Sequence, residues 1–119
     1  EIVIALKGAQ SMTATLPQAE LDALNLANGH RVVLLINATE ISLLDNSEDT
    51  LFSARNLFSA TVIRIQEDGV DAEVVLRLND TDILTAIITR HSLNNLALSI
   101  GSHINLMFKS NAVILATPD

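Results

Sequence analysis

The feature that most constrains the fold of this chain is an internal repeat. Residues 1–47 align with residues 73–119 without a gap, at an offset of 72 positions. Eleven of the 47 aligned pairs are identical, and many others are conservative, such as Ile2 with Val74 and Ile41 with Val113. Because the apolar pattern stays in register over the whole stretch, the chain is expected to fold as two copies of one small unit.

The two copies differ in length. The second unit is complete and spans residues 53–119, whereas the first, residues 1–47, has no counterpart of residues 53–72. An acidic, turn-like linker at residues 48–52 joins them. We therefore expect the first unit to lack its first strand. A barrel with such a gap leaves an open sheet edge, so we expect strand exchange between subunits and at least a homodimer.

Alternating segments of β-branched residues predict five strands and one short helix in the complete unit. A turn is expected at residues 67–69, and Thr89 is a candidate cap for a helix that has Leu93 and Leu96 on one face. The expected strands span residues 54–66, 72–79, 83–89, 103–109 and 112–117, with the last two joined tightly around Ser110 and Asn111. This content favours a small barrel of the OB type.

The first unit repeats the same order of elements. The expected strands lie near residues 1–7, 11–16, 31–37 and 40–44, and a helix runs from Pro17 to Leu26. Proline suits the first turn of a helix, since its missing N–H would have no partner there. The predicted fold class is therefore all-β, with two tandem OB-like five-stranded barrels that each carry one short helix.

Composition limits the partners of the chain. A formal net charge of −7, with no Trp or Tyr and three Phe, disfavours direct binding of nucleic acid, which uses cationic surfaces and stacking aromatics. The absence of cysteine excludes disulfides and thiolate metal sites. Apolar runs such as residues 32–36 are much shorter than the ~20 residues of a membrane-spanning helix. No signal-peptide pattern is present, so we expect a cytoplasmic protein without membrane insertion.

Polar side chains at the start of the complete unit could hold an anion. Alternation along a strand puts Ser53 and Arg55 on one face, and Ala54 and Asn56 on the other. A guanidinium stays charged and donates several hydrogen bonds at once, which suits an oxyanion. Taken alone, these residues are explained more simply as a solvated strand edge.

Two further groups offer donors for an anion. Lys109 and Ser110 lie at the junction of the last two expected strands and supply an ammonium and a hydroxyl. Thr89 and Ser92 begin the expected helix, where unpaired N–H groups and the helix dipole favour negative charge. A solvated turn lysine and simple capping by Thr89 are the alternative interpretations.

Catalysis and cation binding find little support in the sequence. The histidines His30, His91 and His103 lack metal-ligand spacing, and surface positions are expected for them. The acidic residues do not follow a calcium-loop pattern. No Ser–His–Asp or Cys–His arrangement and no Gly-rich phosphate loop is present, so we do not expect an enzyme.

The complete unit resembles the Mop (TOBE) molybdate-binding domain family. The resemblance rests on Ser53–Phe58 with Thr61-Val62 and Val70–Val74, on Thr85–Ser92, and on Gly101 and Phe108–Ser110. It covers the second unit fully and the first unit except for its missing start. Such domains occur in molbindins, in the effector half of the molybdate-responsive transcription regulator, and at the end of the molybdate transporter's ATPase subunit.

The resemblance implies binding of molybdate or tungstate in a polar pocket between subunits. It implies Ser53 and Arg55 in one wall of the pocket and Lys109 with Ser110, Thr89 and Ser92 in the other. The full set of oxyanion-binding residues that it implies is Ser53, Arg55, Asn56, Thr89, Ser92, Lys109 and Ser110.

The first unit departs from this pattern. Asn37, Pro17 and Glu20 stand in the places of Lys109, Thr89 and Ser92. A carboxylate near a dianion is unfavourable and proline removes a donor, so we expect the first unit to be a poor site or a structural partner.

Several functions remain open from the sequence. The chain could be the sensor domain of a molybdate-responsive regulator or a storage molbindin. The alternatives are the C-terminal regulatory domain of a molybdate transporter ATPase subunit and a structural or interaction barrel without a ligand. Molybdate and tungstate are not separated by the sequence, because the two ions are close in size and charge.

Overall fold

The computed structural model describes residues 2–6, 10–25, 28–45, 54 and 56–118. The regular structure of these residues consists of nine strands and two short α-helices. The first part of the chain forms β1 (Ile2–Ala5), β2 (Ser11–Ala14), α1 (Gln18–Leu24), β3 (Val33–Ile36), the 3-10 turn η1 (Ala38–Glu40) and β4 (Ser42–Leu44). The second part forms β5 (Asn56–Asp68), β6 (Asp71–Arg77), β7 (Ile83–Thr89), α2 (Arg90–Asn95), β8 (His103–Phe108), η2 (Ser110–Ala112) and β9 (Val113–Ala116). The predicted all-β class and the short helix of each unit are confirmed.

The turn between β5 and β6 is shorter than predicted. Glu67 and Asp68 belong to β5, and Asp68 pairs with Asp71 across the hairpin. Only Gly69 and Val70 form the turn, and Gly69 has a φ of 60°. A two-residue hairpin turn needs such a left-handed conformation, which glycine adopts without a steric penalty. The glycine therefore lets strand pairing continue through residues that look turn-like in the sequence.

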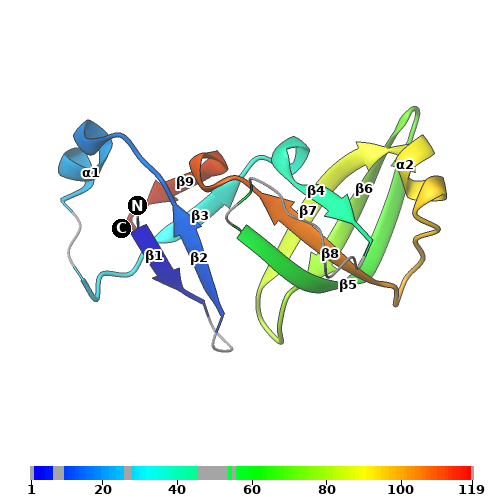
Figure 1. Cartoon of the computed structure of the whole chain (residues 1–119), viewed down its shortest axis with the longest axis horizontal. Coiled ribbons are helices and arrows are strands. Elements are labelled where there is room, and N and C mark those ends of the chain that lie inside the picture. The colour runs from blue at the N-terminus through cyan, green and yellow to red at the C-terminus, as the bar shows by residue number, and fades with distance from the viewer. Residues whose placement is uncertain (1, 7–9, 26–27, 46–53, 55, 119) are drawn as a thin grey trace.

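A curled five-stranded sheet forms the larger lobe of the molecule. Its strand order is β4-β8-β5-β6-β7, and every neighbouring pair is antiparallel. Figure 1 shows the long β5 running across this lobe, with α2 at its outer end. The sheet is therefore a half-barrel of the kind that the alternating sequence predicts.

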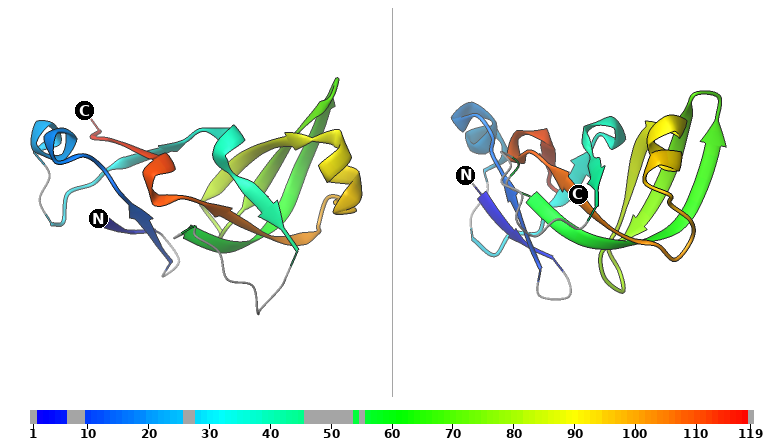
Figure 2. Two further views of the ribbon diagram at one scale, coloured as in Figure 1. Left: turned by 45° about the horizontal axis from the view of Figure 1, so that its top comes forward. Right: turned by 45° about the vertical axis from the view of Figure 1, so that its right-hand side comes forward.

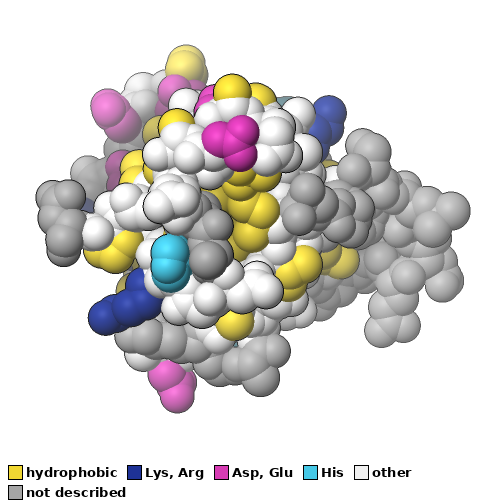
Figure 3. Space-filling view, turned by 90° about the vertical axis from the view of Figure 1, so that its left-hand side faces the viewer, with side chains coloured by type: hydrophobic (Ala, Val, Ile, Leu, Met, Phe, Trp, Pro, Cys, Tyr) yellow, Lys and Arg dark blue, Asp and Glu magenta, His cyan; other side chains and the backbone are white. Residues whose placement is uncertain are grey.

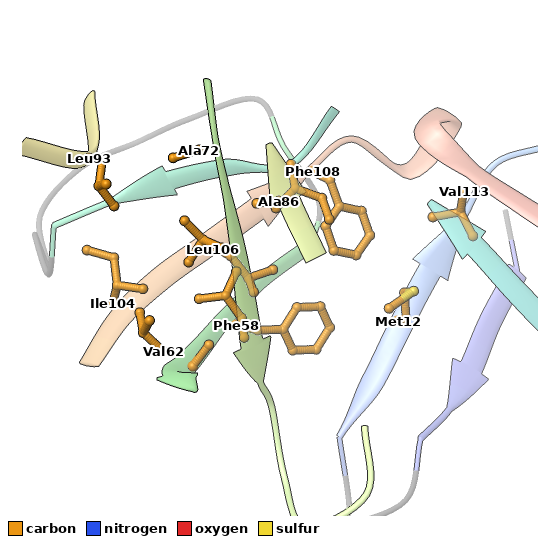
Figure 4. Packing of buried hydrophobic residues seen from close by; sticks show 14 of the residues in the cluster. Met12, Phe58, Val62, Ala72, Ala86, Leu93, Ile104, Leu106, Phe108 and Val113 are labelled. Carbon is orange, nitrogen blue, oxygen red and sulfur yellow. The ribbon is translucent and has the colours of Figure 1, made fainter. Parts of the chain in front are cut away.

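The core lies on the concave side of this sheet. Alternate residues of β5, β6 and β8 point inward, and Val62, Leu76 and Leu106 are fully buried. The rings of Phe58 and Phe108 stack with their centroids 6.0 Å apart. Figure 4 shows these side chains converging from neighbouring strands. The period of two in the sequence thus produces one apolar face, whose burial drives the folding of this lobe.

The two units exchange their last strands, a feature that the sequence analysis did not anticipate. Strand β4 of the first unit pairs with β8 of the second, and β9 of the second pairs with β3 of the first. The two pairings have the same register, since Leu43 lies opposite Leu106 and Leu34 lies opposite Leu115. The expectation that residues 103–109 and 112–117 stay in one barrel is therefore wrong, because η2 carries the chain across to the other lobe.

The smaller lobe consists of two separate sheets. One is the hairpin of β1 and β2, and the other is the pair β3 and β9. Both appear at the left of Figure 1, and Figure 2 shows them from two further directions. In the repeat, β1, β2 and β3 are the counterparts of β6, β7 and β8. The pair β1-β2 therefore corresponds to the pair β6-β7 of the larger lobe, and the pair β9-β3 corresponds to the pair β4-β8. Within the described residues, no strand occupies the place that β5 has between β8 and β6.

Neither helix of the described residues has the length and apolar character that a membrane span requires.

Candidate functional site

Asn56, at the start of β5, joins the two lobes. Its side chain is buried, with 2% of its surface exposed. The amide oxygen accepts a hydrogen bond from the Thr13 backbone N–H at 2.7 Å, and the amide nitrogen donates to the Thr13 carbonyl at 2.8 Å. The amide thus pairs with the β2 backbone as a neighbouring strand would. Both functions of the Asn56 amide are used within the protein, so this residue positions the strand that follows Ser53 and Arg55.

Lys109 and Ser110 lie beside the same contact. Asn56 pairs with Phe108 in the β5–β8 ladder, which brings Lys109 next to the start of β5. The Ser110 carbonyl accepts from the Thr15 N–H at 3.0 Å, and the Ser110 hydroxyl oxygen accepts from the Thr15 hydroxyl at 2.8 Å. Residues from both units therefore fix this corner of the molecule.

The corner formed by Asn56, Lys109 and Ser110 offers donors to an anion. Lys109 is exposed, and its ammonium has no ion pair with any described residue. The Ser110 hydroxyl accepts from Thr15, so its own hydrogen is available to donate outward. An exposed ammonium next to a hydroxyl that is held by the Thr15 side chain forms a charged donor set of the kind that oxyanions prefer.

Thr89 and Ser92 lie at the opposite end of the larger lobe. Thr89 pairs with Asp71, and Asp71 pairs with Asp68 at the far end of β5 from Asn56. At about 3.3 Å per residue, the 13 residues of β5 correspond to ~40 Å along the strand. The structure therefore separates these two residues from Lys109 and Ser110 within one chain.

The predicted cap at Thr89 is confirmed. The Thr89 hydroxyl accepts from the Ser92 N–H at 3.1 Å and donates to the Ser92 hydroxyl at 3.0 Å. The neighbouring Arg90 guanidinium binds the Glu67 carboxylate at 3.3 Å and the Gly69 carbonyl at 3.1 Å. The cation nearest to this helix start is thus engaged in holding the β5–β6 turn. The Ser92 hydroxyl accepts from Thr89, so its own hydrogen is left to donate outward.

Ser53 and Arg55 lie outside the described residues. Ala54 and Asn56 are described, and Asn56 is buried.

The corresponding positions of the first unit are occupied differently. Asn37, in the place of Lys109, accepts from the Thr39 N–H at 3.1 Å and from its hydroxyl at 2.9 Å, so its amide oxygen stabilises η1. Pro17, in the place of Thr89, begins α1 without a side-chain cap, and Glu20 adds a negative charge to the first helical turn. The charged and hydroxyl donors of the second unit have no equivalents here.

Thr13 and Thr15 are the residues of this corner that the sequence analysis missed. Both lie on or next to β2 of the first unit, and they hold Asn56 and Ser110. Thr13 aligns with the identical Thr85 in the repeat. This identity indicated that the two threonines share a structural role, but it did not indicate that Thr13 binds Asn56.

The histidines occupy the surface positions that were predicted. His30, His91 and His103 are all exposed. Among the described residues, no three His, Cys, Asp or Glu side chains are arranged to hold a metal ion.

Comparison with known proteins identifies relatives over nearly the whole chain. The Molybdenum transport protein ModE of Herbaspirillum seropedicae is 30% identical over 116 residues, which are 98% of this chain and 43% of that protein. The Molybdenum-pterin-binding protein MopA of Rhodobacter capsulatus is 31% identical over 118 residues, which are 99% of this chain and 44% of that protein. The chain thus spans less than half the length of these relatives.

A solved structure has the same fold. The crystal structure of the cytoplasmic molybdate-binding protein ModG, with molybdate bound, matches with a TM-score of 0.92 and 31% identity, over 98% of this chain and 82% of that one. The model of the TOBE domain family matches residues 1–43 and 53–115, one match for each repeat unit. With most of its length matched by this model, the chain belongs to the TOBE domain family.

Proposed function

We propose that this chain binds molybdate or tungstate as an oxyanion, and that the corner formed by Asn56, Lys109 and Ser110 carries half of the site. The observation that supports this most directly is the exposed Lys109 ammonium, which forms no ion pair with a described residue, beside a hydroxyl that both lobes hold in place. ModG, whose structure contains molybdate, has the same fold over 98% of this chain. The binder acts in the cytoplasm, as a sensor domain or a storage protein rather than as an enzyme.

The site is completed between two copies of the chain. Thr89 and Ser92 are too far along the sheet to reach the anion held by Lys109 of the same chain. A second copy could bring its helix start to this corner and add the Ser92 hydroxyl as a donor. Arg55, directly before the anchored Asn56 in the sequence, supplies the guanidinium that the dianion needs in addition to one ammonium, and Ser53 supplies a further hydroxyl. The functional protein is therefore at least a homodimer.

The domain serves a regulator or a storage protein rather than a transporter ATPase. Its first unit keeps a helix, α1, of seven residues, against six residues in α2. A transporter appendage is expected to have a shorter helix segment in its first unit. The two repeat units, residues 1–47 and 53–119, then act together as one ligand-binding body, since each contributes a strand to the other.

Titration calorimetry with molybdate, tungstate and sulfate tests the proposed ligand. We expect saturable binding of the first two ions. Lys109→Gln removes one charge-assisted hydrogen bond, worth ~1.5–3 kcal/mol, and should weaken binding at least about tenfold. Arg64→Gln is the matched control, because it removes the same charge from an exposed side chain of β5 that donates to Gln66.

Two results would contradict this function. One is the absence of heat with either ion when the protein is in its oligomeric form. The other is an equal loss of affinity in the two variants, which would indicate a general effect of net charge instead of a site at Lys109.

A further inference from the structure

The smaller lobe presents different side chains at its two ends. Figure 3 shows hydrophobic side chains gathered in a hollow at the free end of this lobe, and Ile4 and Leu34 are among the residues that line it. At the other end, where β2 meets the larger lobe, Thr13 holds Asn56 and Thr15 holds Ser110. The hydroxyl-bearing end of the first unit therefore lies next to the corner proposed to bind the anion.

Thr15 and Ser110 are joined twice, once through the backbone and once through the side chains. The Thr15 N–H donates to the Ser110 carbonyl at 3.0 Å, and the Thr15 hydroxyl donates to the Ser110 hydroxyl oxygen at 2.8 Å. The backbone bond holds the two residues together independently of their hydroxyls. Because a hydroxyl carries a single hydrogen, a Ser110 oxygen that accepts from Thr15 keeps its own hydrogen for another acceptor. The Thr15 hydroxyl thus orients the Ser110 hydroxyl.

The equivalent place in the other half of the repeat has no hydroxyls. At the offset of 72, Thr15 aligns with Ile87 and Ser110 aligns with Ala38. There β7 packs against η1, as β2 packs against η2 in the corner with the hydroxyls. The lysine of the hydroxyl-bearing corner is replaced there by Asn37. An apolar pair therefore suffices for the contact between units, and the hydroxyl pair occurs only where the ammonium also occurs.

We propose that Thr15 is a positioning residue of the anion site, whose hydroxyl directs the Ser110 hydrogen toward an oxyanion bound beside Lys109. This inference rests on the proposed function. Thr15 acts through Ser110 and does not itself touch the anion. Donation to the Ser110 oxygen also polarises that hydroxyl and strengthens it as a donor. The first unit, which lacks the donors of the second, thereby takes part in the site of the second unit.

The alternative role of this hydroxyl is a bond that only joins the lobes. Under that role, its removal would lower the stability of the chain without changing the anion affinity of the folded protein. The Thr15 side chain is exposed, and substitutions at such positions usually change stability little. The backbone bond from Thr15 to Ser110 and both bonds of Asn56 would also remain. Affinity and stability together therefore distinguish the two roles.

The test is titration calorimetry of the full chain, in its oligomeric form, with molybdate. Thr15→Val keeps the shape of the side chain but removes the hydroxyl, and it should weaken binding about three- to tenfold with little change in melting temperature. Thr15→Ser restores the hydroxyl and should bind within about twofold of the unchanged protein. The matched control is Thr61→Val, which removes a hydroxyl that contacts the His103 ring at 3.2 Å and should leave the affinity unchanged.

A double-mutant cycle shows whether Thr15 acts through Ser110. Ser110→Ala removes the hydroxyl that Thr15 orients, so adding Thr15→Val to it should weaken binding no further. An additive loss in the double variant would overturn the proposal, because Thr15 would then act by another route.

The remaining outcomes separate this inference from the proposed function. Unchanged affinity in Thr15→Val, together with weakened binding in Lys109→Gln, would overturn the positioning role and leave the anion site in place. Failure of the unchanged protein to bind molybdate would reject the proposed function, and the positioning role with it. Circular dichroism shows whether Thr15→Val is folded. If it is not, Thr15→Ala serves as the test, with the same expected loss and the same rescue by Thr15→Ser.

Discussion

Asn56 shows how a residue near a binding motif can have a structural role. Asparagine usually prefers exposed turns and is rarely buried without partners. Here the side chain is buried between the lobes and uses both its donor and its acceptor on one backbone unit of β2. The sequence grouped Asn56 with the anion-binding residues, and the structure shows that its side chain anchors the strand that begins there.

Replacing Asn56 with Ala should lower the free energy of unfolding by about 1–3 kcal/mol, because the Thr13 N–H and carbonyl would lose their partners in a buried position. Urea denaturation followed by circular dichroism measures this loss. Asn94→Ala, at an exposed position of α2, should change stability by no more than about 0.5 kcal/mol. Equal effects of the two substitutions would argue against the anchor.

At the scale of elements, the local sequence accounts for each strand and helix but not for the pairing. Alternation predicted the strands, and the Thr89 cap predicted the start of α2 within a residue. Strand partners depend on where η1 and η2 direct the chain, and both turns lead into the opposite lobe. The exchanged strands place Leu34 opposite Leu115 and Leu43 opposite Leu106, and these two pairs are equivalent in the repeat. Pairing of the last strands within a unit would therefore give the same leucine–leucine contacts as pairing between units.

Thr89→Ala should destabilise the protein by ~0.5–2 kcal/mol, since the Ser92 N–H would lose its capping oxygen. Thr89→Ser keeps a hydroxyl at this position and should retain most of that stability. Thermal melts of the two variants in the absence of oxyanion measure capping alone. If Thr89→Ser is as unstable as Thr89→Ala, the cap is not the source of the effect.

The strand exchange predicts that damage to β9 appears in the first unit. Leu115 is buried and lies opposite Leu34, so Leu115→Ala should cost ~2–5 kcal/mol and speed amide exchange in β3 more than in β8. Ile114→Ala is the control, because Ile114 is on the same strand but 56% exposed. Faster exchange confined to β8 would mean that β9 belongs to its own unit.

At the scale of the whole molecule, the halves of the proposed site lie at opposite ends of the larger lobe. Lys109 and Ser110 are at the start of β5, and Thr89 and Ser92 are at its other end. One chain cannot close such a site, but two chains related by a twofold axis could form two equivalent sites, each with one half from each copy.

A mixing experiment tests this arrangement. Lys109→Gln and Ser92→Ala should each weaken molybdate binding when prepared alone. In a mixed oligomer, one of the sites would combine Lys109 of one copy with Ser92 of the other, so mixing the two variants should restore part of the binding in calorimetry. A mixture that binds no better than the average of its components would contradict a site shared between copies.

The sequence by itself determined the repeat, the strand-forming segments, the capped helix and the residues available to bind an anion, because each depends on local periodicity or on side-chain chemistry. An open sheet edge was also expected in the first unit, and within the described residues β1 and β3 each pair with a single strand. Only the tertiary structure decided that the last strands are exchanged, that Asn56 is an anchor, and that Thr89 and Ser92 lie far from Lys109. The physical reason is that the aligned leucines would face one another both in a strand pairing within one unit and in the exchanged pairing. The local sequence therefore does not distinguish the two pairings, and contacts between the units decide which one forms.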